Sequence, residues 1–136
     1  MNEQKNMTFC QVMDYVEELK TYGSVPGLTN IQNLCTKLQM PQNDLKFVHI
    51  AGTNGKGSVL AFVSEILKEA GYRVGRYLSP TIFEYRERIQ INGKSISKKD
   101  LCRMMTIMKN ACEELLSEGN THPTAFEIET ARAFLY

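Results

Sequence analysis

Apolar residues recur every three or four positions in five stretches of the chain, and this spacing predicts five amphipathic helices. Two flanking signals support the assignment. Gly71 follows the third stretch in the position of a glycine that ends a helix. The segment Ser97–Asp100 precedes the fourth and resembles a capping box with Asp in place of Glu. The predicted helices cover residues 8–20, about 30–38, about 57–70, about 101–115 and 124–136.

Shorter apolar runs rich in β-branched residues predict strands. Phe47–Ala51 reads as a buried strand, and residues 73–78 read as the next one, with the third helix between them. This strand–helix–strand order over about thirty residues indicates a βαβ unit, with a parallel sheet and a right-handed crossover. Residues 89–91 are a short extended piece, and the turn signal Asn92-Gly93 closes it.

The resulting fold prediction is α/β: an incomplete N-terminal P-loop domain of three layers, with helices flanking a mostly parallel sheet. One βαβ unit contributes only two strands, whereas nucleotide-binding sheets contain more. The chain ends on the apolar residues Phe134-Leu135-Tyr136, without a polar cap. We therefore expect residues 1–136 to be a fragment, a partial ATP-binding domain.

Composition narrows the picture. A chain of 136 residues suffices for one compact domain, and a formal net charge of +1 gives no reason to expect nucleic acid or an anionic membrane as a partner. No apolar run reaches transmembrane length, and no apolar signal core follows the N-terminus. The four cysteines form no C-x-x-C pair, so we expect reduced thiols rather than zinc ligands or disulfides. A cytoplasmic location follows as the default expectation.

A glycine-rich turn between the predicted strand and the third helix is the strongest chemical signal. The usual phosphate-binding loop reads G-x-x-x-x-G-K-[ST], but here Gly57 separates Lys56 from Ser58. Glycines permit backbone conformations in which successive N–H groups face phosphate oxygens, and lysine adds a mobile positive charge. The alternative is a glycine-rich turn that binds nothing. The predicted ATP-binding residues are Gly52, Thr53, Asn54, Gly55, Lys56, Gly57 and Ser58.

The extended motif His49–Ser58 closely resembles the folylpolyglutamate synthase and dihydrofolate synthase family, within the Mur ligase superfamily. The G-T-N-G-K-G-S variant of the loop is typical of that family and accounts for the extra glycine. Weaker similarities follow in the family's order along nearly the whole chain. They are Tyr22-Gly23 with Gly27-Leu28, Leu78-Ser79-Pro80, Glu87-Arg88-Ile89 with Asn92-Gly93, and Thr124–Glu127 with Thr130-Ala131 and Ala133-Phe134.

The resemblance implies an enzyme that phosphorylates a carboxylate of folate or dihydropteroate with ATP and then forms an amide with L-glutamate. Lys56 would be the catalytic residue, with Ser58 in the phosphate–magnesium region. Ser79 and Glu127 match family Mg²⁺ ligands, and both present hard oxygens. Without the resemblance, Ser79 reads as part of a plain Ser-Pro turn and Glu127 as a solvated glutamate in a first helical turn.

Residues 80–92 resemble the family's folate-contacting loop that links domains. Arg86 and Arg88 would bind glutamyl carboxylates there, and the alternative is a solvated loop of mixed charge. The family usually has histidine after Ser-Pro, but Thr81 stands here, so the contact from that histidine is lost. We interpret His49 and His122 as structural.

The resemblance also implies what lies outside residues 1–136: a further histidine ligand, a modified lysine, the adenine-contacting region and a C-terminal glutamate-binding domain. We therefore expect this chain alone to be inactive and the full-length parent to be a monomer. Two alternatives stay open. One is another Mur-type amide ligase, which the short N-terminus disfavours because it leaves no room for a UDP-binding domain. The other is a P-loop nucleotide-binding module without ligase activity.

Overall fold

The computed structural model describes residues 5–136, which form two compact units. The helical unit combines residues up to Leu45 with Lys98–Tyr136. The hairpin unit consists of Lys46–Ser97.

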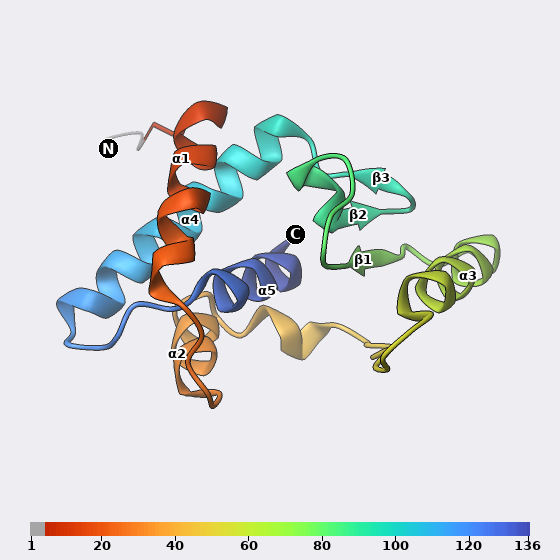
Figure 1. The fold of residues 1–136 in the computed structure, drawn as a ribbon, viewed down its shortest axis with the longest axis horizontal. Coiled ribbons are helices and arrows are strands. Elements are labelled where there is room, and N and C mark those ends of the chain that lie inside the picture. The colour runs from red at the N-terminus through yellow and green to blue at the C-terminus, as the bar shows by residue number, and fades with distance from the viewer. Residues whose placement is uncertain (1–4) are drawn as a thin grey trace. The chain divides into compact units, whose positions relative to one another are not determined.

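Four α-helices and two short 3₁₀ turns build the helical unit. Helix α4 packs against α1, α2 and α5, and α2 also packs against α5 (Figure 1). The elements are α1 (Phe9–Leu19), η1 (Lys20–Tyr22), α2 (Thr29–Lys37), η2 (Pro41–Asp44), α4 (Lys98–Ser117) and α5 (Ala125–Leu135). All four helices agree with the periodicity of the sequence, within one residue of the predicted ends for α1, α2 and α5 and within three residues for α4.

The apolar stripes of these helices meet in one core. The stripe predicted for the first helix is buried at Val12, Val16 and Leu19, each at most 7% exposed. Helix α4 contributes the largest share, because eight of its residues are buried along its length. Side chains that are completely buried include Val12, Leu34, Ile96, Leu101, Met105, Met108, Ile128 and Ala131, all in this unit except Ile96.

Local signals fix the ends of the helices. Thr8 and Thr124 are N-caps in capping boxes at the starts of α1 and α5. Helix α4 ends at a left-handed glycine, Gly119, with φ +82°. The N–H of Asn120 then donates to the carbonyl of Leu115 at 3.0 Å, as in a Schellman motif. Each of these ends therefore satisfies backbone groups that helix geometry leaves open.

The hairpin unit contains one helix and a small sheet. Strand β2 pairs antiparallel with β1 on one side and with β3 on the other. Asn92 and Gly93 connect β2 to β3 with φ values of +48° and +77°, as a type I′ hairpin turn requires. The elements are α3 (Lys56–Glu69), β1 (Gly75–Tyr77), η3 (Tyr85–Arg88), β2 (Ile89–Ile91) and β3 (Lys94–Ser95).

Two sheet predictions are wrong for the described residues. Residues 47–51 form no strand, and the sheet is antiparallel rather than mostly parallel. An apolar segment of this type forms a strand only when neighbouring strands pair with its backbone N–H and C=O groups. Within residues 5–136, the sheet order β1-β2-β3 leaves no strand on the second side of β1. Phe47 and Val48 are accordingly 58% and 63% exposed.

The four thiols differ in their exposure. All four cysteines are free; Cys35 and Cys112 are buried, whereas Cys10 is exposed. Burial raises the pKa of the Cys112 thiol to about 12. None of the described helices is both long and apolar enough to cross a membrane.

Candidate nucleotide site

The glycine-rich loop opens directly into α3. Gly55 is the N-cap of this helix, with φ +75°, a left-handed conformation that favours glycine over any residue with a Cβ. Gly52 also has positive φ, at +151°. The sequence prediction of a helix starting near Gly57 is therefore confirmed to within one residue. The glycines at these two positions allow the chain to turn sharply into the first helical turn.

Lys56 folds back over the loop that precedes it. Its Nζ donates to the carbonyl of Gly52 at 2.6 Å and to the carbonyl of Thr53 at 3.2 Å. Both contacts are exposed to solvent. Because the ammonium is held by neutral carbonyls rather than by a carboxylate, a phosphate oxygen can replace these partners with a gain in charge complementarity. The ammonium of Lys56 therefore lies beside the loop, where it is accessible from solvent.

The start of α3 fits an anion. No side chain caps this helix and its first turn carries no acidic residue, so its N-terminal N–H groups and positive dipole end are open to a ligand. A Cβ built on Gly55 or Gly57 would meet nothing within 4 Å, which leaves space beside the backbone for phosphate oxygens. Ser58 is an exposed residue in the same turn. Donors, charge and space together suit a triphosphate.

The two predicted metal ligands belong to different units. Ser79 lies just beyond β1 in the hairpin unit, as do the loop and Lys56, and it is exposed. Glu127 lies in the first turn of α5 in the helical unit and is only 7% exposed. The described residues contain no group of three or more His, Cys, Asp or Glu side chains able to hold a metal. Joint coordination of one Mg²⁺ ion by Ser79 and Glu127 therefore stays a prediction.

Glu127 is not the solvated glutamate that its first-turn position alone suggests. Its Oε2 accepts from the backbone N–H of Thr124 at 2.7 Å and from the hydroxyl of Thr124 at 2.9 Å. This is the second half of the α5 capping box. The spacing Thr124-x-x-Glu127 carries that signal in the sequence, and our sequence interpretation missed it.

Arg86 and Arg88 both have partners inside the hairpin unit. The Arg86 guanidinium forms a bidentate pair with Glu84, with N–O distances of 2.8 and 3.0 Å, and donates to the carbonyl of Ile96 at 3.2 Å. The Arg88 guanidinium carbon lies 5.6 Å from the centre of the Tyr85 ring. These contacts give both arginines a role within the loop, and their contact with a substrate carboxylate stays a prediction.

Glu87 is a loop residue to which the sequence interpretation gave no role of its own. Its Oε2 accepts from the backbone N–H groups of Ile82 and Phe83, both at 3.2 Å. The carboxylate thereby fixes the backbone of a loop tip whose side chains are 81% and 89% exposed. No local pattern predicts this role, because the contact depends on how residues 80–88 fold back on themselves.

His122 lies where a structural interpretation expects it. Its ring stacks on that of Tyr22, with centroids 4.0 Å apart and planes 9° from parallel. Its Nδ1 lies 2.6 Å from the carbonyl of Pro123. His49 is exposed in the extended segment before the loop.

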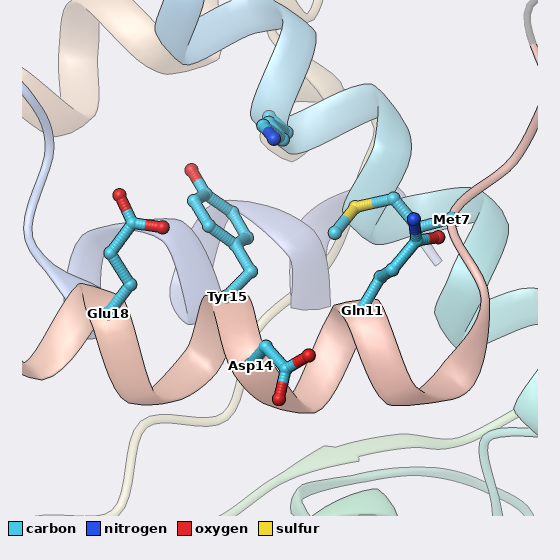
Figure 2. A pocket seen from close by; sticks show the side chains of 6 residues that line it. Met7, Gln11, Asp14, Tyr15 and Glu18 are labelled. Carbon is cyan, nitrogen blue, oxygen red and sulfur yellow. The ribbon is translucent and has the colours of Figure 1, made fainter.

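The helical unit contains a cavity whose lining includes none of the predicted site residues. It has a volume of about 260 Å³ and is lined by side chains from α1 and its leading segment, with Lys109 from α4. Figure 2 shows Tyr15 and Glu18 extending from one side of α1. Burial raises the pKa of the Tyr15 phenol, and Lys109 Nζ sits 5.6 Å from the centre of its ring. None of its lining residues is a predicted ligand of nucleotide or metal.

Comparisons with known proteins bear on the family of the chain. No protein-family model matches the chain. The dihydrofolate synthase/folylpolyglutamate synthase of Bacillus subtilis is 44% identical over 115 residues, which are 85% of this chain and 27% of that protein. The crystal structure of folylpolyglutamate synthase from Thermotoga maritima has 42% identity and a TM-score of 0.84, covering 94% of this chain and 30% of that one.

A folylpolyglutamate synthase solved as a complex with AMPPCP and folate matches with 30% identity and a TM-score of 0.83, over 96% of this chain and 32% of that one. The chain thus spans less than a third of the length of each of these relatives. The fold and the three matched proteins point to one class of protein, the dihydrofolate and folylpolyglutamate synthases. The chain belongs to the folylpolyglutamate synthase and dihydrofolate synthase family.

Proposed function

We propose that this chain is the nucleotide-binding segment of an enzyme that uses ATP to ligate L-glutamate to folate or dihydropteroate. The observation that carries the proposal is the glycine-rich loop, which opens the uncapped N-terminus of α3 beneath the ammonium of Lys56. The relatives' names give the substrate class, and the solved complex with AMPPCP and folate names a nucleotide analogue and a folate as ligands of one relative.

The chemistry explains why such a loop is needed. A carboxylate is a poor electrophile, and ATP supplies the phosphoryl group that makes it an acyl phosphate, from which the amine of L-glutamate displaces phosphate. In this chain, the N–H groups at the start of α3 bind and orient the phosphates. Lys56 exchanges its two carbonyl partners for a phosphate oxygen and offsets charge that develops during transfer.

A Mg²⁺ ion completes the proposal. Ser58 and Ser79 offer hydroxyl oxygens and Glu127 offers a carboxylate oxygen, a donor set of the hard type that Mg²⁺ takes. Arg86 and Arg88 are proposed to bind glutamyl carboxylates of the substrate, which requires Arg86 to exchange Glu84 for that group.

In the complete enzyme, we propose that the hairpin unit joins a P-loop domain of three layers. The support is the match of more than nine-tenths of the chain to solved synthases, with TM-scores of 0.84 and 0.88. In such a domain, residues 47–51 would gain the neighbouring strands that the described residues do not supply. We expect the 136-residue chain alone to release no ADP in response to L-glutamate.

Substitution of Lys56 tests the proposal. In the full-length enzyme, K56A should lower glutamate-dependent ADP release by about a hundredfold or more, because the charge on the transferring phosphoryl loses its cation. The matched control is K68A on the same helix, since Lys68 pairs with Glu65 at the far end of α3. K68A should keep nearly full activity. Full activity in K56A, or folate-independent ATP turnover by the wild type, would contradict the proposed reaction.

A further inference from the structure

We propose that Arg76 binds an α-carboxylate of a glutamyl chain that the folate substrate already carries, and that it does so beside Arg88. The inference rests on the proposed function, in which Arg88 binds glutamyl carboxylates. It adds a residue to the substrate site and states which substrates the enzyme favours, namely folates that already carry glutamate over dihydropteroate.

Arg76 lies in the middle of β1, where strand pairing fixes its position. It is directly opposite Gln90 in the antiparallel register. The pairing continues past the ends of the strands, because the N–H of Leu78 donates to the carbonyl of Arg88 at 3.0 Å. Side chains alternate between the two faces of a sheet, so Arg76 and Arg88 are diagonal neighbours on one face. Such neighbours lie roughly 7 Å apart.

The guanidinium of Arg76 is held in place but not paired. In the part of the chain that the structure describes, no hydrogen bond or ion pair involves this side chain. Burial reaches its Nε, which has no acceptor, but not its two terminal nitrogens. Across the strand, the amide of Gln90 is engaged elsewhere, since its Nε2 donates to the carbonyl of Glu87 at 3.1 Å. The terminal donors of Arg76 are therefore available to a ligand from solvent.

The hairpin unit supplies no carboxylate for this arginine. Its lysines and arginines outnumber its glutamates, and it has no aspartate. Glu84 pairs with Arg86, and Glu87 accepts from two backbone N–H groups of its own loop. Two guanidiniums on one face of a sheet repel each other, and a bound carboxylate relieves this repulsion. An arginine fork holds a carboxylate with two parallel hydrogen bonds, so this face suits a ligand with more than one carboxylate.

The chemistry of the substrates decides which of them fits this face. Dihydropteroate has a single carboxylate, and that group is the one that reacts. A folate with one glutamate has an α-carboxylate in addition to the reacting γ-carboxylate, and every further γ-linked glutamate adds another α-carboxylate. Arg88 and Arg76 can therefore hold the α-carboxylates of successive glutamyl residues while the terminal γ-carboxylate stays available for phosphorylation.

The test compares R76Q with the wild type of the full-length enzyme by glutamate-dependent ADP release. Three substrates are used: dihydropteroate, a reduced folate with a single glutamate, and its triglutamate. The wild type should have its highest kcat/KM with the triglutamate. R76Q should lower that value by about tenfold, mainly through KM, because one charge-assisted pair is lost. It should leave kcat/KM for dihydropteroate unchanged. R76K keeps the charge without the planar fork and should recover part of the loss.

R73Q is the matched control, because Arg73 is an exposed cation just before the same strand and its loss changes the net charge equally. It should leave kcat/KM unchanged for all three substrates, since the charge of an exposed side chain is screened by salt. An equal loss with every substrate in R76Q would assign Arg76 to the fold of β1 and overturn the binding role. So would an unchanged triglutamate, or a wild type that prefers dihydropteroate. A wild type that ligates glutamate to none of the three would instead contradict the proposed function.

Discussion

The helical unit and the hairpin unit use their apolar side chains in opposite ways. In the helical unit, the stripes of α1, α2, α4 and α5 face one another, and residues such as Leu34 and Met105 are completely buried. In the hairpin unit, the stripe of α3 contains Phe62 and Ile66 at 71% and 67% exposed. Both helices α3 and α4 are predicted equally well from periodicity, so a good amphipathic pattern does not by itself mean burial.

This difference assigns the packed core to the helical unit and the proposed phosphate-binding loop to the hairpin unit. The unit with the core carries Glu127, fixed by a cap and by tied loops. The unit with exposed apolar residues carries the phosphate loop, whose open N–H groups and spare space suit a ligand. Low packing around a binding loop is expected, because ligand sites draw on the less stable parts of a protein.

The largest expected difference between the two units is in the reactivity of a cysteine thiol on α4 and one on α3. A pH of 8 is far below the Cys112 pKa of about 12. The fraction of this thiol present as thiolate should therefore be about a thousandfold smaller than for an ordinary cysteine. Raising the pH toward 12 should increase its reactivity. A cysteine introduced in α3 by F62C should react at the rate of an exposed thiol. Maleimide labelling followed by peptide mass spectrometry measures both sites, and equal rates would contradict the burial of α4.

Removal of core volume should produce the next largest effect. L34A empties space between α2, α4 and α5, and should lower the free energy of unfolding by about 2–5 kcal/mol. F62A, on the exposed stripe of α3, should change it by less than about 0.5 kcal/mol in the 136-residue chain. Urea denaturation followed by far-UV circular dichroism gives both values. A loss in F62A as large as that in L34A would show that α3 has a core of its own.

A change in the hairpin turn should have the smallest effect and stay within its own unit. G93A places a Cβ at φ +77°, which should cost about 1 kcal/mol, although the added atom meets nothing closer than 4.0 Å. G93N should cost less, because asparagine tolerates this conformation. Amide hydrogen exchange should show faster opening at Asn92 and Ile96 in G93A, with α1 and α4 unaffected. Unchanged exchange at these two amides would contradict the turn assignment.

Much of this architecture was readable from local pattern. The starts of α1 and α5 lie within one residue of the starts predicted from periodicity, although the capping boxes at Thr8 and Thr124 that define these starts were not identified. The β2–β3 turn lies at Asn92-Gly93 because few residue pairs accept positive φ twice in succession. The phosphate loop, too, was identified by residues within one segment. In all these cases the interacting residues are close in sequence, so the local order of residues is enough to predict the interaction.

Several misses involve partners far away in sequence. Residues 47–51 have the composition of a strand, but strand formation needs a neighbouring chain that accepts hydrogen bonds, and none of the described strands takes that place. The ties between α2 and the loop at 120–122 join residues 87 and 91 positions apart, and no local signal marks them. The pairing of Arg86 with Glu84 is a different kind of miss, because these residues are two positions apart and a run of mixed charges offers several equivalent local partners.

The sequence by itself determined the helices, their caps, the hairpin turn and the loop that opens α3, because each depends on backbone preferences and contacts within a few residues. Only the tertiary structure decided which apolar stripes are buried, that the sheet is antiparallel, and that Glu127 is buried rather than solvated. Burial is a property of the surroundings, and those surroundings come from residues that are distant in the chain.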